Sequence, residues 1–226
     1  SWRIKKSVMS KSLNSLNERI IRCMKCQRLV NFRESVALKK TKRFIKDNYW
    51  GKPVIGFGDP NAKIIIIGLA PAAHGGNRTG RVFTGDKSAD FLFKCLHQAK
   101  LSNQPYSQHL NDGLTLKNVY MTPALKCVPP EDKPKAEELK KCFVYLSEEI
   151  SYLESAKIIL ALGKIAFESC VKLFNLKPSL HKFIHGAEYS INKKLKILAC
   201  YHPSPRNVNS GKINEAQMVE VLNIVR

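Results

Sequence analysis

The sequence predicts an α/β fold in which a mostly parallel sheet carries helices on both faces. Short apolar runs alternate with amphipathic helical patterns along the chain. Strands that alternate with helices favour parallel pairing through crossover connections. The run Ile64–Ile67 is β-branched and uninterrupted, which is typical of a strand that is buried on both faces.

The predicted elements follow one another in a regular order. Apolar spacing, with Val8 on the apolar side, predicts a basic amphipathic helix over residues 7–22. Strands are predicted over residues 63–68, 118–122, 158–162 and 195–201. Helices are predicted from an N-cap at Ser88 to Ala99 and over residues 135–153, 163–174 and 213–225. Residues 181–194 are interpreted as a hairpin-like excursion.

The loop that follows the first strong strand is the predicted active site. Residues 68–86 hold five glycines, two arginines, His74, a single aromatic residue (Phe83) and a single carboxylate (Asp86). Glycine lets backbone approach a ligand closely, and open α/β sheets bind ligands at the carboxyl ends of their strands. The four predicted strands would gather four loops at one edge, over residues 68–87, 123–133, 163–164 and 202–211.

The charge balance predicts a polyanionic partner. The chain has 38 Lys and Arg against 18 Asp and Glu, a net charge of +20. Residues 1–46 contain fourteen of these cations and only Glu18 and Glu34, so +12 of the charge lies there. A basic face of this kind suits phosphates, and the alternative is a solvated lysine-rich surface. With no apolar run near the ~20 residues of a membrane span, we expect no membrane association.

The cysteines predict a metal centre. Cys23 and Cys26 form a C-x₂-C pair, and fourteen residues separate Cys127 from Cys142. Four thiolates in this pattern fit either a structural zinc ion or a [4Fe–4S] cluster, although Cys142 also fits the apolar side of its helix. Three other cysteines fall on apolar faces and are interpreted as buried small hydrophobic residues: Cys95, Cys170 and Cys200.

Three parts of the chain together resemble one family. Residues 68–86 resemble the first motif of the type-B (family 5) uracil-DNA glycosylases, and residues 202–212 resemble their second motif. The four cysteines match the cluster ligands of the iron–sulfur uracil-DNA glycosylases. The resemblance implies a three-layer α/β/α fold with a four-stranded parallel sheet. It also implies a [4Fe–4S] cluster on Cys23, Cys26, Cys127 and Cys142.

The implied activity is base excision from DNA. The reaction hydrolyses the bond between deoxyribose C1′ and the N1 atom of a uracil that is flipped out of the duplex. Phe83 is the predicted stacking wall, with a core anchor as the alternative. In related enzymes the counterpart of His202 donates a hydrogen bond to the O2 atom of the base as negative charge develops there. The enzyme is expected to be monofunctional, because no lysine lies in the core of either motif.

Asp86 is the predicted catalytic carboxylate. In other classes of the superfamily an Asp or Asn stands early in the first motif, where this chain has Pro71, Ala72 and Ala73. Asp86 is therefore assigned to orient the water or stabilise the sugar cation, and the alternative is a cap of the following helix. A Thr–Asn pair of family 4 is replaced by Thr122–Pro123, which predicts tolerance for other deaminated or damaged bases.

Further residues are predicted to bind the base or the DNA backbone. Arg206 is expected to wedge into the duplex, and a helix N-terminus at residue 163 suits phosphate. The full predicted binding set is Phe83, Ala70, His74, Gly75, Asn77, Gly163, Lys164, Ser204, Arg206 and Asn207; Asn209, Ser210 and Lys212 also suit phosphate contacts.

The whole chain is interpreted as one glycosylase domain, in which residues 1–57 form a basic part that carries two of the cluster cysteines. We expect a cytoplasmic, nucleoid-associated monomer whose partner is DNA with uracil or other deaminated bases. A sliding clamp is a further candidate partner that the sequence does not identify. The alternative function is that of an iron–sulfur nucleic-acid-binding protein without catalytic activity.

Overall fold

The computed structural model describes the backbone of residues 2–226 and the side chains of residues 12–226. The predicted inward position of Val8 therefore lies outside the described side chains. The strands are β1 (Phe57–Gly58), β2 (Ile64–Gly68), β3 (Val119–Pro123), β4 (Ile158–Leu162), β5 (Glu188–Ser190) and β6 (Lys196–Cys200). The α-helices are α1 (Trp2–Ile21), α2 (Gln27–Lys39), α3 (Gly76–Thr79), α4 (Lys87–Gln98), α5 (Ala136–Ser151), α6 (Lys164–Leu173), α7 (Pro205–Asn209) and α8 (Glu215–Val225).

The sheet confirms the predicted parallel core. Its strand order is β1-β3-β2-β4-β6-β5, and the four strands β3, β2, β4 and β6 are parallel to one another. Ile66 of β2 lies opposite Met121 on one side and Leu160 on the other. The two edge strands, β1 and β5, are antiparallel. Each has only two or three residues, too few for a strand pattern, so the sheet has six strands where four were predicted.

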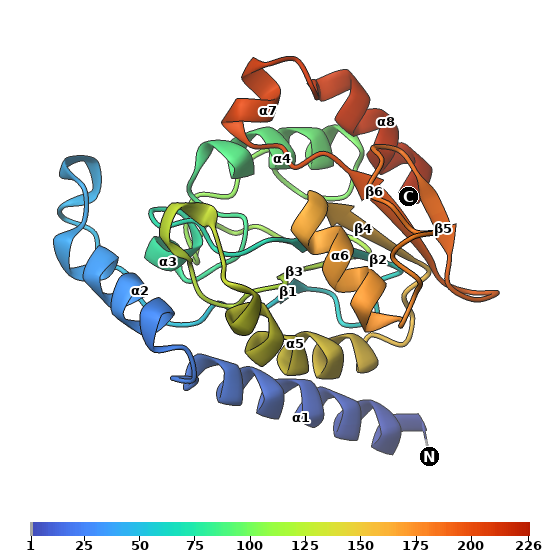
Figure 1. Ribbon diagram of the computed structural model, residues 1–226, viewed down its shortest axis with the longest axis horizontal. Coiled ribbons are helices and arrows are strands. Elements are labelled where there is room, and N and C mark those ends of the chain that lie inside the picture. The colour runs from blue at the N-terminus through green and yellow to red at the C-terminus, as the bar shows by residue number, and fades with distance from the viewer. Residues whose placement is uncertain (1) are drawn as a thin grey trace.

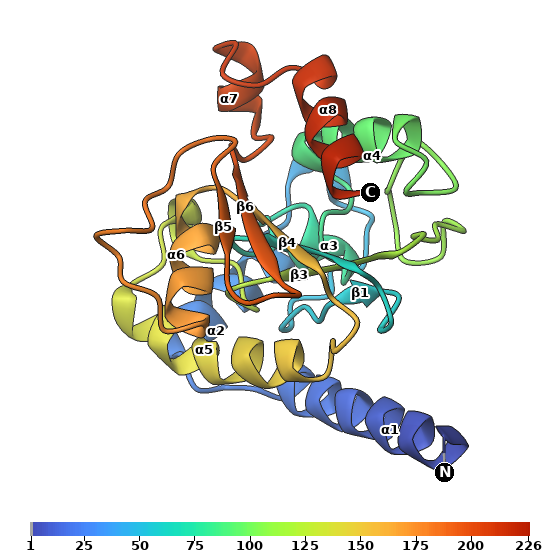
Figure 2. The same ribbon diagram turned by 90° about the vertical axis from the view of Figure 1, so that its right-hand side faces the viewer.

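Alternate residues of the central strands pack into two cores, one on each face of the sheet. Ile64 and Ile66 pack with helices α4 and α8, whereas Ile65 and Ile67 pack with α1, α5 and α6. Figure 1 shows α4 and α8 on one side of the sheet and α5 on the other, with α1 lying along the outer side of α5. Figure 2 shows the same layers from the side. The predicted three-layer arrangement is confirmed.

Several boundaries differ from the sequence-based expectations. Residues 27–39 form helix α2, which was not among the predicted helices. Helix α4 begins at Lys87 with Asp86 as its N-cap, so the predicted cap at Ser88 is wrong. The predicted excursion at residues 181–194 contains β5, which pairs with β6.

The parallel strands place four connections at the carboxyl edge of the sheet, as predicted. These connections leave β2, β3, β4 and β6. Every helix within residues 2–226 is too short or too polar to span a bilayer.

Candidate active site

Phe83 lies against the end of strand β2. Its φ of 47° is in the left-handed region, which a bulky residue rarely adopts. A Cβ atom on Gly68 would lie 2.4 Å from Cζ of the ring. Glycine at the end of β2 is therefore needed for the ring to reach this position. The half-buried ring also packs against the core beneath α4, a contact that agrees with the alternative interpretation of Phe83 as a core anchor.

The two carboxylate oxygens of Asp86 have different neighbours: Oδ1 caps helix α4, and Oδ2 faces the loop over residues 68–86. Its Oδ1 atom accepts a hydrogen bond from the backbone N–H of Ala89 at 2.8 Å, which caps α4. A Cβ atom on Gly75 would lie 2.5 Å from Oδ2. Burial raises the pKa of the carboxyl group, and the Ala89 hydrogen bond lowers it in part. The cap is real, and it leaves one oxygen for other partners.

His74 lies beside Asp86 in one pocket. The pocket has a volume of about 370 Å³, and Ala72, Gly75 and Asp132 also line it. Tyr49 from the basic N-terminal part meets the His74 ring edge-on, and its hydroxyl group lies 2.8 Å from Nδ1. Burial and the nearby Arg78 charge lower the pKa of His74. The imidazole therefore favours its neutral form.

Asn77 has a structural contact. The residue is buried, and its amide donates to the carbonyl oxygen of Arg33 at 3.2 Å. Its side chain thus joins the first-motif loop to helix α2. Arg78, the next residue, donates to the carbonyl oxygens of His74 and Gly85. Both side chains hold the loop in shape.

His202 lies at the end of β6 in a second pocket of about 360 Å³. Gly163 and Lys164 at the start of α6 line the same pocket, as does Asn207. Burial lowers the pKa of the His202 imidazole to about 4, so the ring is neutral near pH 7. A neutral ring keeps one N–H donor without a positive charge.

The turn after His202 is capped by its own side chains. Ser204 accepts a hydrogen bond from the backbone N–H of Asn207 at 3.2 Å, and it caps the short helix α7. The Asn207 amide donates to the carbonyl oxygen of His202 at 2.8 Å. Arg206 is exposed on this turn. Asn207 therefore orients the backbone that carries His202.

Seven of the twelve predicted catalytic and binding residues line the two pockets, and five line neither of them: Ala70, Asn77, Phe83, Ser204 and Arg206. Asp86, His74 and Gly75 line one pocket, and His202, Gly163 and Lys164 line the other. The segment after β2 contributes to both, because Leu69 lines the His202 pocket and Ala72 lines the Asp86 pocket. Ala70 lies between these two residues and is half-buried.

The four predicted metal ligands line one cavity. Cys23 and Cys26, from the connection between α1 and α2, face Cys127 and Cys142 across it. Burial raises the pKa of the Cys142 thiol to about 12 and that of Cys127 to about 11. The other three cysteines are buried in the two cores, as predicted: Cys95, Cys170 and Cys200.

A buried arginine supplies positive charge to this cavity. Arg33 is 3% exposed, and its guanidinium donates to Cys127 Sγ at 3.3 Å and to the carbonyl oxygens of Cys23 and Gly51. No carboxylate among the described side chains pairs with it at salt-bridge distance. Such a charge requires a compensating anion, and thiolates would provide one. The donor set therefore fits an anionic sulfur-ligated group.

Sequence reasoning missed several residues of the site. Arg33 lines the cysteine cavity, Asp132 lines the pocket of Asp86, and Tyr49 contacts His74. None of the three was predicted, although the loop that holds Asp132 was expected at this edge. Thr122, in the pair that replaces the Thr–Asn of family 4, is fully buried, and its hydroxyl donates to Glu149 at 2.8 Å. Glu131 and Asp132 both have positive φ values in the structure. The residue types at these positions do not indicate this conformation.

The fold and these sites define an α/β protein with a neutral imidazole and a half-buried carboxylate at one sheet edge and a separate cavity lined by four cysteines. A family model described as the uracil DNA glycosylase superfamily matches residues 55–226. A type-5 uracil-DNA glycosylase of Thermus thermophilus is 45% identical over 88% of this chain and 90% of its own length. One of Pyrobaculum aerophilum is 44% identical over 90% of this chain and 88% of its own.

A type-4 uracil-DNA glycosylase of Archaeoglobus fulgidus is more distant, at 30% identity over 85% of this chain and 82% of its own length. The chain belongs to the uracil DNA glycosylase superfamily, and its similarity to type-5 members covers nearly its whole length.

Proposed function

We propose that the protein is a uracil-DNA glycosylase that excises uracil from DNA by hydrolysis and leaves an abasic site. Its type-5 relatives carry this activity in their names. The observation that carries the proposal is His202, a neutral imidazole at the carboxyl end of a central parallel strand. A neutral N–H donor placed at the base O2 atom stabilises the negative charge that the departing uracil develops. A charged imidazolium would instead lose its proton to the leaving group.

Phe83 supplies the stacking wall. An extruded base loses its neighbours in the duplex and regains contact on an aromatic face. The strained backbone at Phe83 holds the ring at the end of β2 before the base arrives, and such strain clusters at functional sites. A preformed wall reduces the entropy that base binding costs.

Asp86 orients the attacking water. Its cap uses Oδ1, and Oδ2 faces Gly75 in the pocket that also holds His74. Since burial raises its pKa, the carboxylate is a better base than an exposed aspartate. His74 and the amide of Gly75 are the neighbouring polar groups for this water or for the base.

The enzyme accepts several deaminated bases, because its side chains make few contacts with the hydrogen-bonding edge of the base. At the end of β3, Thr122 uses its hydroxyl on Glu149 and Lys126, and Pro123 has neither an N–H nor a polar side chain. These two residues therefore provide no side-chain donor to separate uracil from other deaminated bases. A panel of duplexes with uracil, hypoxanthine or xanthine tests this breadth.

The DNA backbone is gripped at the same sheet edge. The DNA backbone contacts come from three places: Gly163 and Lys164 at the start of α6, Ser204 and Arg206 around α7, and Asn207 near His202. Helix N-termini favour phosphate, and the net charge of +20 supports a polyanionic substrate. Arg206 is exposed on its turn, as a wedge residue requires.

Cys23, Cys26, Cys127 and Cys142 hold a [4Fe–4S] cluster. They line a single cavity beside the unpaired cation Arg33. The described residues include no group of three or more His, Cys, Asp or Glu side chains that could hold a metal ion. Four thiolates can hold either a structural zinc ion or a [4Fe–4S] cluster, and the similarity to type-4 and type-5 uracil-DNA glycosylases favours the cluster. When bound, the group would crosslink the α1–α2 connection to α5, through Cys142, and to the segment that precedes it, through Cys127.

The proposal also covers domain organisation, oligomeric state, location and protein partners. Residues 1–226 act as one glycosylase domain, with residues 1–57 as the basic part that carries two cluster cysteines. The enzyme works as a monomer at the nucleoid in the cytoplasm. A sliding clamp is a candidate partner.

A duplex with a single uracil tests the activity. The purified protein should release uracil and leave an alkali-labile site, with no covalent adduct after borohydride treatment. A protein that binds this duplex but releases no base above background would instead be the catalytically inactive iron–sulfur binding protein. Visible absorbance and iron analysis test the cluster separately, and a colourless zinc protein would contradict it.

A further inference from the structure

We propose that the buried ion pair between Arg81 and Asp112 is a positioning device for Phe83. Through it, the connection over residues 102–117 controls base stacking, although no substrate contact is assigned to that connection. The inference rests on the proposed function, because it assumes that Phe83 stacks on the base.

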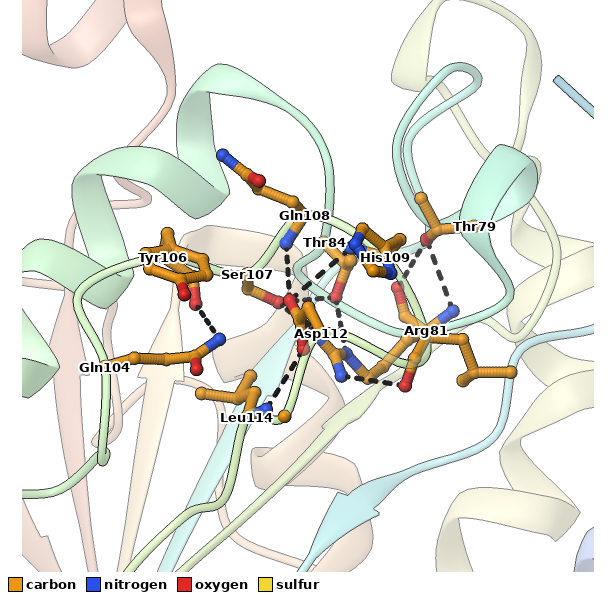
Figure 3. Close-up of polar contacts among 12 residues, drawn as sticks. Thr79, Arg81, Thr84, Gln104, Tyr106, Ser107, Gln108, His109, Asp112 and Leu114 are labelled. Carbon is orange, nitrogen blue, oxygen red and sulfur yellow. Dashed lines mark hydrogen bonds and ion pairs between the residues drawn. The ribbon is translucent and has the colours of Figure 1, made fainter. Parts of the chain in front are cut away.

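The ion pair lies inside the protein, between two loops. The Arg81 side chain is 4% exposed and that of Asp112 is 2% exposed, and Nη2 of Arg81 lies 2.8 Å from Oδ2 of Asp112. Asp112 also accepts hydrogen bonds from the backbone N–H groups of Gln108 and Leu114. These contacts hold the pKa of Asp112 at about 2, although burial opposes them. Figure 3 shows the two side chains pointing toward each other between their loops.

Further hydrogen bonds connect the ion pair to the backbone on both sides of Phe83. Arg81 donates to Thr84 at 3.0 Å and to Ser107 at 2.9 Å. Thr84 lies 2.7 Å from Ser107 and donates to the carbonyl oxygen of Val82. On the far side, the backbone N–H of Gly85 donates to the carbonyl oxygen of Ser107 at 2.8 Å. These hydrogen bonds therefore hold the residues on both sides of Phe83, which are Val82 before it and Thr84 and Gly85 after it.

This arrangement explains how Phe83 keeps an unfavourable backbone. Gly80, Phe83 and Gly85 have φ values of 81°, 47° and 81°, and only glycine adopts this region without cost. A strained residue persists when the surrounding contacts over-determine it. The ring itself is held by packing against Gly68 and the core beneath α4. The contacts of Arg81, Thr84 and Gly85 hold the backbone from which it projects.

A buried ion pair is weak evidence for stability, because desolvation of both charges offsets their attraction. A specific loop conformation is the better-attested use of such a pair. Here the loop carries the stacking ring and, three residues further on, Asp86. Arg81 and Asp112 are thus positioning residues for the reaction.

A double-mutant cycle on the cluster-loaded protein tests the proposal. Single-turnover excision of uracil from a duplex is measured for Asp112→Asn, Phe83→Ala and the double variant. We expect Asp112→Asn to lower the rate constant roughly 10- to 100-fold without changing affinity for an undamaged duplex. In the Phe83→Ala background the same change should have an effect within about twofold, because Asp112 acts through the ring.

The controls separate positioning from folding. Ser107→Ala keeps both charges and should show the same non-additivity with a smaller loss, which decides the question if Asp112→Asn does not fold. Glu188→Gln removes a carboxylate from an exposed ion pair with Lys196 and should leave the rate unchanged. Additive losses in the cycle, or a wild-type rate for Asp112→Asn, would overturn the proposal. A wild-type protein that excises no uracil would instead overturn the proposed function.

Discussion

At the residue scale, the two carboxylate oxygens of Asp86 have different surroundings. Its Oδ1 atom caps helix α4 and its Oδ2 atom faces the first-motif loop. The sequence left catalysis and capping as alternatives, and the geometry is compatible with both at once. A substitution that keeps the cap but removes the charge separates the two roles.

Asp86→Asn is that substitution. Asn and Asp are about equally good N-caps, so the thermal stability should stay close to that of the wild type. If the carboxylate orients water, the single-turnover excision rate should fall at least roughly 100-fold, while affinity for the uracil duplex persists. Asp86→Ser, which also caps well, is the matched control and should lose the same activity. A near-wild-type rate for either variant would leave Asp86 with the cap alone.

His202 makes a prediction about pH. Burial lowers its pKa to about 4, so the neutral donor is present throughout the range above that value and is lost only as the pH falls toward 4. The excision rate should therefore show no step near pH 6.5, the ordinary pKa of histidine. Any acidic limb at higher pH should come from Asp86, whose pKa is raised, and should be absent in Asp86→Asn. A step near 6.5 that disappears in His202→Asn would contradict this assignment.

At the scale of elements, the central strands and their helices could be predicted because their signals are local. The run at Ile64–Ile67 fixes β2, and Gly163 marks the start of α6 as expected. The short edge strands and helix α2 escaped prediction, because β1 has two residues and α2 has a weak apolar side. Contacts such as Arg81 with Asp112 are 31 positions apart and depend on how two loops meet, which no local pattern encodes.

A buried ion pair between elements leads to a prediction about stability. Lys126 and Glu149 are 1% and 0% exposed and lie 2.6 Å apart. Glu149→Gln leaves the lysine without its anion, which should cost about 3–5 kcal/mol. For a chain of this size the midpoint of thermal unfolding should fall by roughly 6 to 20 °C.

The matched control replaces both charges. Lys126→Met combined with Glu149→Leu removes the pair without leaving a buried charge, and its unfolding temperature should lie above that of Glu149→Gln. Thermal scans followed by circular dichroism, with iron content measured in parallel, check both variants. If the double variant is the less stable one, the pair contributes net stability and this ranking is wrong.

At the scale of the whole molecule, the charge and the sheet edge work together. A net charge of +20 attracts DNA to the protein, and +12 of it lies in residues 1–46. The parallel strands set the position of the site, because they place the first-motif loop, the start of α6 and the turn after His202 at one edge. The composition predicted the partner, and the strand pattern predicted the edge. The division of the site into two pockets could not be predicted from the sequence. It depends on the fold of the loop, in which Leu69 lines the His202 pocket and Ala72 lines the Asp86 pocket.

Lysines at opposite edges of the sheet should therefore differ in their effect on DNA binding. Lys164 begins α6 at the carboxyl edge, whereas Lys194 lies in the turn before β6, at the amino edge. Both side chains are on exposed residues. If the carboxyl edge grips the backbone, Lys164→Ala should reduce the slope of log K against log salt by about 1, the value for one phosphate contact. Lys194→Ala should leave it unchanged. Fluorescence anisotropy with an undamaged duplex over a salt series measures both slopes, and equal changes for the two variants would mean that the charge acts diffusely over the whole surface.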